Sequence, residues 1–324
     1  MLMMIFYLVL IILFSFLLIK ATDILVVNLR AFSKVSGMGE FVTTALILAL
    51  ATSFPELFVG LTAAFEGQPN LSLGNVVGSN IANLSLVTGG AALIGGSLAV
   101  HGIFLRRDVF YAFLAGAAPM ILLFDKYLGR VDALILLALY GFYNTWILAE
   151  RRREMMEEEK GGVTRRFLRY LNHQGTKKEL AWIFLGIAFL LFSADMIVHL
   201  ATKLALLAHI HIFMIGLFLV AVGTSLPELA FETKAVREHK PSMVFGNLLG
   251  SIVANSTLII GVTSLISPIR IGAFREYLLA TMAFVVIFGL FYFFIRTKRK
   301  LERWEGVVLL GVYLIFVLLE FLKL

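Results

Sequence analysis

The chain has 324 residues, of which 60% are hydrophobic and 15% are charged, and it carries a net charge of +7 and no cysteine. A soluble domain has roughly 45–50% apolar and about 25% charged residues, so this composition excludes an ordinary soluble protein, a disordered chain and a disulfide-stabilised secreted domain. The basic residues lie between apolar blocks rather than along one face, which argues against a nucleic-acid-binding protein. The composition is typical of a protein embedded in the lipid bilayer.

Ten apolar blocks follow one another along the chain, each long enough for a membrane-spanning helix of about 20 residues. They show no period-two alternation, so a β-barrel is not expected. The first block lacks the basic start and the small-residue cleavage site of a signal peptide. We therefore predict an all-α polytopic membrane protein with ten transmembrane helices. The blocks cover residues 3–29, 40–65, 71–99, 108–125, 128–149, 180–205, 211–235, 242–266, 275–295 and 304–322.

The longest polar stretch, residues 150–179, contains nine Lys and Arg residues. Cytoplasmic loops of membrane proteins are enriched in these residues, so we interpret this stretch as a cytoplasmic loop. When successive spans cross the membrane in alternating directions on either side of this loop, 21 of the 28 Lys and Arg residues lie on the cytoplasmic side. The same alternation puts both termini outside, in a multi-pass protein of the plasma membrane. About 30 residues cannot bury a core of their own, so we expect a loop here rather than a domain.

Two motifs recur along the chain at one constant separation, which we call the repeat offset. Ala-Thr-Ser-Phe-Pro-Glu at 51–56 recurs as Gly-Thr-Ser-Leu-Pro-Glu at 223–228, and the Gly-Asn-x-x-Gly-Ser segment that begins at Gly74 recurs at Gly246. Asp23 recurs at the same separation as Asp195. The chain therefore divides into repeats over residues 1–149 and 180–324, with the loop 150–179 between them. Each repeat has five spans, an odd number, so the second crosses the membrane in the opposite sense. Such inverted repeats are typical of secondary transporters, whose ion sites lie near the membrane midplane.

Glu56 and Glu228 fall near the middle of the second and seventh blocks. An ionisable residue at the centre of a membrane helix costs about 2.5–3.5 kcal/mol and usually marks an ion or proton pathway. The structural alternative is a protonated glutamate that is hydrogen-bonded inside the helix bundle. A proline precedes each glutamate, and a proline inside a helix leaves a backbone carbonyl without its partner. The carbonyls in question belong to Ala51 and Gly223.

Hydroxyl and amide side chains accompany the two glutamates in both repeats. A single Thr or Ser in a membrane helix usually bonds its own backbone, and the glycines of the repeated motif can also be explained by close helix packing. Oxygen ligands without thiols suit hard cations such as Ca²⁺, Mg²⁺ or Na⁺ rather than zinc or copper. The sequence therefore predicts a cation site. Its side-chain oxygens come from Thr52, Ser53, Ser79, Asn83, Thr224, Ser225, Ser251 and Asn255.

These paired motifs resemble the α-repeats of the cation/Ca²⁺ exchanger superfamily. The Thr-Ser-x-Pro-Glu signature at 52–56 and 224–228 resembles the sodium/calcium exchanger branch and its prokaryotic relatives. The resemblance covers essentially the whole chain. It implies a secondary active antiporter, not an enzyme, that exchanges Ca²⁺ for Na⁺ across a prokaryotic plasma membrane by alternating access. The transported ions are then the only ligands, no cofactor is needed, and we expect a monomer.

The resemblance also implies roles for individual residues. Glu56 and Glu228 would bind Ca²⁺ centrally, and spans one and six would slide as a gating pair across the other eight. Flanking Na⁺ sites would be lined by Thr52, Ser53, Ser79, Thr224, Ser225 and Ser251. Further ligand positions match Asn83, Asn255 and the backbone carbonyls of Ala49 and Ala221.

The chain departs from the family pattern at three positions. Asn255 stands where many members have an aspartate, Ile252 stands where the first repeat has Asn80, and Ala51 replaces a usual glycine. The first departure leaves two carboxylates, so a proton/Ca²⁺ (or other divalent-cation) antiporter of the same fold is the alternative. Against it, proton/calcium members tend to have a Gly-Asn-Ala-x-Glu motif, which this chain lacks. A cation channel is less favoured, because duplicated midplane carboxylates suit an occluding carrier.

Overall fold

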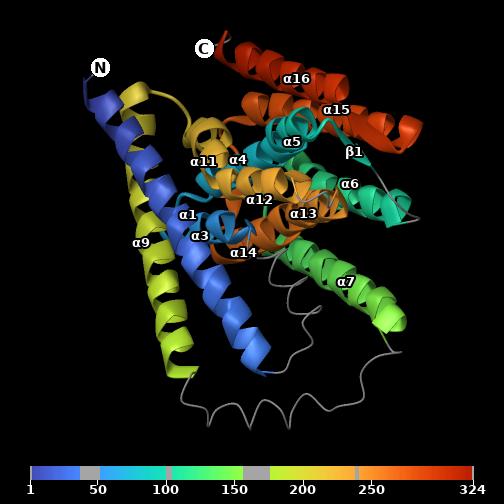
Figure 1. The fold of residues 1–324 in the computed structure, drawn as a ribbon. Helices are drawn as coiled ribbons and strands as arrows, with labels where there is room; N and C mark the ends of the chain where they lie inside the picture. The colour runs from blue at the N-terminus through green and yellow to red at the C-terminus, as the bar shows by residue number, and fades with distance from the viewer. Residues whose placement is uncertain (1, 37–51, 100–103, 156–175, 238–240, 323–324) are drawn as a thin grey trace.

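The computed structural model describes residues 2–36, 52–99, 104–155, 176–237 and 241–322 (Figure 1). The first half contains α1 (Leu2–Ser36), α3 (Phe54–Phe65), α4 (Pro69–Ala82), η1 (Asn83–Val87), α5 (Thr88–Gly95), β1 (Ser97–Ala99), α6 (Phe104–Leu122), η2 (Leu123–Asp125), β2 (Tyr127–Leu128) and α7 (Arg130–Met155). The second half contains α9 (Thr176–Ala208), α10 (Ile212–Met214), η3 (Ile215–Val220), α11 (Ala221–Thr224), α12 (Leu226–Arg237), α13 (Pro241–Val253), η4 (Ala254–Ile259), α14 (Ile260–Ile266), β3 (Ile269–Arg270), α15 (Phe274–Lys298), β4 (Lys300–Glu302) and α16 (Arg303–Phe321). Here η2 is a 3₁₀-helix, and η1, η3 and η4 are π-helical.

The repeat offset seen in the motifs also relates the helices of the two halves. Shifting the bounds of α3 by this offset gives those of α12, and the same shift carries α4 onto α13 to within one residue. The π-helix η1 likewise coincides with η4 to within one residue. A π-helix is rare and commonly marks a functional position. Its recurrence at equivalent places is a feature that sequence periodicity did not predict.

Eight helical segments of the described residues are long and apolar enough to cross a membrane. They are α1, α6, α9, α15, α16 and three composite helices built from α4–η1–α5, from α10 to α12, and from α13–η4–α14. The predicted span 40–65 is described only from Thr52 on, and its helix α3 has 12 residues. The predicted span 128–149 corresponds to the 26-residue helix α7, which is not among the eight. The all-helical membrane fold is thus confirmed, while the count of ten spans stays a prediction.

The buried apolar side chains form two separate clusters. The larger one joins α4, α6, α13, α15 and α16, with Leu73, Leu248 and Phe284 among its fully buried members. The smaller one lies between α1 and α9, where Ile11, Leu18 and other apolar residues pack together with side chains of α3. In Figure 1, α1 and α9 run side by side at one edge of the molecule. The smaller cluster therefore packs this helix pair against α3, separately from the larger cluster.

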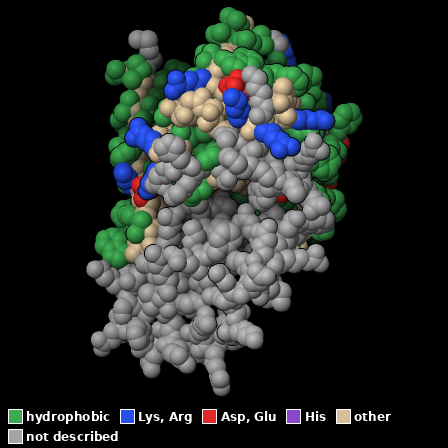
Figure 2. Space-filling view, turned by 45° about the vertical axis from the view of Figure 1, so that its right-hand side comes forward, with side chains coloured by type: hydrophobic (Ala, Val, Ile, Leu, Met, Phe, Trp, Pro, Cys, Tyr) green, Lys and Arg blue, Asp and Glu red, His purple; other side chains and the backbone are tan. Residues whose placement is uncertain are grey.

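Large apolar side chains cover much of the outer surface, as expected for a protein surrounded by lipid. On α16, Leu314 is 59% exposed and Leu318 is 58% exposed. Figure 2 shows Lys and Arg side chains gathered in the upper part of one face, with hydrophobic side chains around them. An apolar surface with grouped basic residues fits a helix bundle whose basic ends face water.

Two glycines bring α4 into backbone contact with the segment that leads to α11. A Cβ atom on Gly74 would overlap the carbonyl oxygen of Phe213, and one on Gly78 would overlap the carbonyl oxygen of Leu217. Only a residue without a side chain permits this approach. The packing interpretation of these two glycines is therefore correct. The close contact places the first half's Gly-Asn-x-x-Gly-Ser segment directly against the second half.

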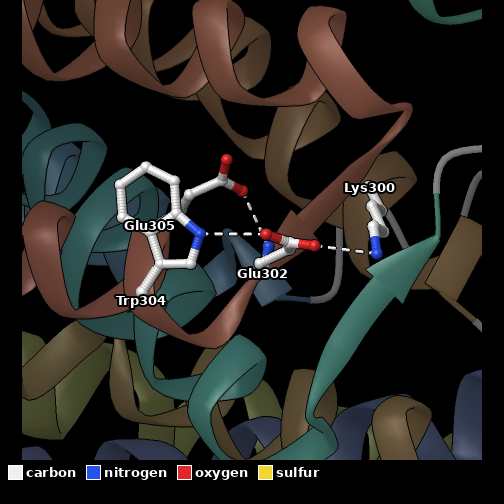
Figure 3. Close-up of polar contacts among 4 residues, drawn as sticks. All are labelled: Lys300, Glu302, Trp304 and Glu305. Atoms are coloured by element: carbon white, nitrogen blue, oxygen red, sulfur yellow. Dashed lines mark hydrogen bonds and ion pairs between the residues drawn. The ribbon is translucent and has the colours of Figure 1, made fainter.

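Short strands of two or three residues are the one departure from an all-helical chain within the described ranges. β1 pairs with β4 and β2 pairs with β3, both antiparallel, so each pair joins the first half to the second. After β4, a capping box begins α16: the backbone N–H of Glu302 donates to Glu305 Oε2 at 2.8 Å (Figure 3). Trp304 Nε1 and Lys300 Nζ contact the Glu302 carboxylate at 2.9 and 2.8 Å. These contacts fix the turn between α15 and α16.

Candidate functional site: a buried cluster of oxygen ligands

Both Pro-Glu motifs stand where a helix begins. Ser53 (φ −88°, ψ 6°) precedes α3, and Ser225 (φ −83°, ψ 0°) separates α11 from α12. Each proline lies in the first turn of α3 or α12, where its missing N–H has no partner to lose. The sequence instead predicted a proline inside a helix beside a free carbonyl, and one of the two carbonyls, that of Ala51, lies outside the described residues. Glu56 and Glu228 consequently lie in the first turns of α3 and α12.

Every described member of the predicted ligand set is buried in the protein interior. Glu56, Glu228, Ser79, Ser251, Thr224, Asn255 and Ala221 are 0% exposed, and the remaining members are at most 6% exposed: Asn83, Ser53, Ser225 and Thr52. Ala49 lies outside the described residues. Because buried polar groups are normally hydrogen-bonded, the partners of these side chains show how the site is built.

Hydroxyl–amide hydrogen bonds join the two halves in a symmetric pattern. Thr52 Oγ1 donates to Asn247 Oδ1 at 2.9 Å, and Thr224 Oγ1 donates to Asn75 Oδ1 at 3.1 Å. The repeat offset converts the first bond into the second. The hydroxyl contacts Thr52–Ser251 (3.4 Å) and Ser79–Thr224 (3.2 Å) are related by the same offset. The predicted Thr and Ser residues thus meet across the interface of the halves instead of bonding only their own backbone.

A third set of bonds has no counterpart in the other half. Asn255 Nδ2 donates to Asn80 Oδ1 at 3.2 Å, and Asn80 Nδ2 donates to Ser256 Oγ at 2.7 Å. The residue equivalent to Asn80 is Ile252, which cannot make such bonds. The Asn255 amide nitrogen is held in this way, and its Oδ1 forms no hydrogen bond with any described residue. Asn80 therefore orients Asn255 so that its oxygen is available as a ligand.

The two glutamate carboxylates are fully buried and are poor in hydrogen-bond partners. Glu56 and Glu228 interact electrostatically with each other, and the hydroxyls of Thr224 and Ser79 lie beside Glu56. None of the four carboxylate oxygens has a hydrogen-bond partner among the described residues, and neither atom of the Asn83 amide has one. A cluster of buried, unpaired oxygen atoms of this kind can hold a hard cation.

The Ala221 carbonyl is less free than the sequence suggested. It accepts hydrogen bonds from the Ser225 backbone N–H at 3.0 Å, from Thr224 Oγ1 at 3.3 Å and from Ser79 Oγ at 3.5 Å. The last two hydroxyls belong to the predicted ligand set, so this carbonyl lies within the cluster and organises it. As an ion ligand it would compete with these hydroxyl donors.

A third buried acid, Glu232, was missed by the sequence reasoning. It is 1% exposed and lies on α12, four residues after Glu228. Its Oε2 accepts a hydrogen bond from Thr88 Oγ1 at 3.2 Å. The residue that the repeat offset makes equivalent to it is Gly60, so no repeated motif marked Glu232. The available signal was its spacing, since residues four apart share one face of a helix.

The repeated aspartates do not line the buried cluster. Asp23 is exposed and lies 3.8 Å from Lys20. Asp195 is about half exposed and lies 3.8 Å from His199, and these two residues can approach a common ion together with the exposed Glu66. This grouping lies between α9 and the end of α3, away from the unpaired carboxylates of Glu56 and Glu228.

Comparisons with known proteins agree with the helical membrane fold and identify a family. The family model described as "Sodium/calcium exchanger protein" matches residues 6–149 and 178–322. The Inner membrane protein YrbG of Escherichia coli is 30% identical over 306 residues, which are 93% of this chain and 92% of YrbG. The Sodium/calcium exchanger MaX1 of Methanosarcina acetivorans is 29% identical over 94% of this chain and 95% of its own. A solved structure of the sodium-calcium exchanger NCX_Mj, soaked with Na⁺ and Sr²⁺, has a TM-score of 0.64 at 27% identity and covers 97% of both chains.

Proposed function

Because the chain belongs to the sodium/calcium exchanger protein family, we propose that it is a secondary active antiporter that exchanges Ca²⁺ for Na⁺ across the plasma membrane. The observation that carries this proposal is the pair Glu56 and Glu228, whose carboxylates are fully buried at equivalent positions of the two halves. Their oxygens have no hydrogen-bond partner among the described residues. Two unpaired carboxylates inside a membrane are costly, and one Ca²⁺ neutralises both.

Exchange follows from competition for the same carboxylates. Ca²⁺ takes six to eight oxygen ligands, which Glu56, Glu228, Asn83 and Asn255 supply together with neighbouring hydroxyls, carbonyls or water. Na⁺ ions held by the Thr and Ser hydroxyls neutralise the same two charges in turn. The site therefore holds Ca²⁺ or Na⁺ but not both. If only a neutralised site can be carried across the membrane, movement of one ion requires return of the other.

Alternating access is assigned to α1 and α9, which move across the remaining helices. The smaller apolar cluster supports this assignment, because a pair of helices that packs through a separate cluster can shift without disrupting the larger core. The two halves insert in opposite senses in this proposal, so equivalent helices exchange roles between the outward and inward states. Both termini then lie outside and residues 150–179 lie in the cytoplasm. The working unit is one chain.

The test is ⁴⁵Ca²⁺ flux into proteoliposomes that contain the purified protein. We expect Ca²⁺ uptake when Na⁺ is loaded inside and pH is equal on both sides, and no uptake when internal Na⁺ is replaced by choline. Uptake driven only by a pH gradient would refute Na⁺ coupling and favour the proton/Ca²⁺ alternative. The specific observation in favour of that alternative is that Asn255 stands in place of a third central carboxylate. Flux that needs no counter-ion would indicate a channel.

A further inference from the structure

The turn between α15 and α16 and the end of α12 carry arginines without an acidic partner. Arg237 ends α12, Arg299 follows α15 and Arg303 begins α16, and all three are exposed. The ion pairs formed among the described residues involve none of the three. The two acids of the turn, Glu302 and Glu305, are already engaged by the contacts in Figure 3. These positive charges therefore remain uncompensated by the described part of the chain.

Packing between distant segments brings the ends of these helices together. A Cβ atom on Gly96 would lie 3.4 Å from Arg303 Nη2, so the guanidinium lies against the backbone at the end of α5. A Cβ atom on the preceding residue, Gly95, would overlap Val236, which directly precedes Arg237. β1 follows the same turn and pairs with β4, the strand that joins α15 to α16. The three arginines therefore come from neighbouring parts of one surface.

Exposed apolar side chains continue from this surface along α15 and α16. Phe293 is 62% exposed, Trp304 is 53% exposed and Val307 is 55% exposed. Phe293 and Val307 lie about 6–8 Å along their helices from the turn. The Trp304 ring packs on Phe294 with 5.5 Å between centroids, and its Nε1 donates to Glu302. A tryptophan with an apolar body and a bonded polar tip is typical of the membrane–water interface. Positive charges thus adjoin an apolar surface at the depth where headgroups meet acyl chains.

We propose that Arg237, Arg299 and Arg303 bind the phosphate headgroup of an anionic phospholipid, whose acyl chains lie against Phe293 and Val307. Guanidinium groups match phosphate in both charge and geometry, and basic surfaces at the cytoplasmic ends of membrane helices bind anionic headgroups. A lipid fits better than a soluble phosphate, because the apolar surface continues from the arginines along both helices. This inference concerns a surface that the proposed exchange cycle does not use.

The test uses Trp304 as a reporter of the lipids beside the arginines. The substitutions Trp146→Phe and Trp182→Phe leave Trp304 as the one tryptophan of the chain. This parent protein is reconstituted in phosphatidylcholine with increasing amounts of a lipid that carries bromine on its acyl chains, which quenches tryptophan fluorescence. Brominated phosphatidylglycerol should quench at a mole fraction at least tenfold lower than brominated phosphatidylcholine, because each arginine near the membrane surface favours an anionic lipid by about fivefold.

Variants of the parent protein locate the preference. Arg299→Gln and Arg303→Gln should each lower it about fivefold. Arg275→Gln makes the same change at an exposed position at the other end of α15, about 35 Å away, and should keep the full preference. Equal quenching by the two lipids in the parent protein would overturn the proposal, and so would a preference that persists in both variants. A preference abolished by excess inorganic phosphate at constant ionic strength would indicate a soluble ligand and also contradict it. None of these measurements depends on Ca²⁺ or Na⁺ transport.

Discussion

Glu228→Gln removes one negative charge from the buried site and leaves the shape of the side chain almost unchanged. Glu228 is 0% exposed, so solvent does not screen the interaction between its carboxylate and a bound ion. Removing one partner from a buried charge pair costs about 3–5 kcal/mol. The half-saturating Ca²⁺ concentration should therefore rise by roughly 100- to 4,000-fold. Glu56→Gln should have an effect of the same size, because the two residues occupy equivalent positions.

The stability of the same variant should change in the opposite sense when no ion is present. Without a cation, the wild type buries a carboxylate whose oxygens have no hydrogen-bond partner among the described residues, and an uncompensated buried charge is destabilising. Glu228→Gln should therefore unfold at a higher temperature than the wild type in a chelator with choline replacing Na⁺. It should also lose most of the thermal stabilisation that Ca²⁺ gives to the wild type, since a ligand stabilises only in proportion to its binding.

Two measurements check this reasoning: ⁴⁵Ca²⁺ flux against Ca²⁺ concentration, and thermal unfolding with and without Ca²⁺. Asp125→Asn is the matched control, because it also replaces a carboxylate by an amide, at an exposed position, and it should alter neither quantity appreciably. A half-saturating Ca²⁺ concentration within threefold of wild type in Glu228→Gln would refute a Ca²⁺ site built on this carboxylate. A lower unfolding temperature without ions would show that the wild-type carboxylate is stabilised by the protein itself.

Three further outcomes are expected. Gly78→Ala should lower stability by about 1–3 kcal/mol in thermal unfolding, because the added methyl meets a backbone carbonyl; unchanged stability would contradict the close contact. Thr52→Val and Thr224→Val should each raise the half-saturating Na⁺ concentration by roughly 5- to 150-fold, since each removes a proposed hydroxyl ligand of Na⁺, a loss of about 1–3 kcal/mol. A large effect in only one variant would contradict the symmetric pattern. The chain has no cysteine, so Asp125→Cys in whole cells should react with an impermeant maleimide while Lys160→Cys should not; the reverse labelling would invert the proposed orientation.

The features that the sequence predicted are those encoded by local chemistry or by repetition. Proline lacks an N–H wherever it occurs, so the interruption of the helix before Glu228 could be expected from the Pro-Glu motif alone. The recurrence of the motifs at one separation identified the two halves, and the helix bounds follow the same separation. The burial of the Thr, Ser and Asn oxygens also agrees with the prediction, because polar groups in an apolar block gain most when they gather around one another.

The features that were missed depend on contacts between distant segments. Asn80 was noted only because its equivalent, Ile252, breaks the pattern, and its role in orienting Asn255 needs the position of a residue 175 positions away. Glu232 was missed because it has no repeated partner. The π-helices arise where helices adjust to one another, so no periodicity of hydrophobic residues indicates them. The location of Asp195 on an exposed part of α9 likewise follows from packing, not from its place in an apolar block.

Two of the departures from symmetry between the halves involve buried polar residues, Asn80 and Glu232. A protein with identical inverted repeats would present equivalent ligand sets to the two sides of the membrane, and its affinities for an ion would then be equal on both sides. Here Asn80 accepts a hydrogen bond from Asn255, whereas its equivalent, Ile252, cannot form the matching bond. The residue equivalent to Glu232 is Gly60. The hydroxyl–amide bonds of Thr52 and Thr224, in contrast, are kept in both halves. In the proposed antiporter the shared bonds belong to a common ion site, so a difference in ion affinity between its outward and inward states must come from the residues that are not shared.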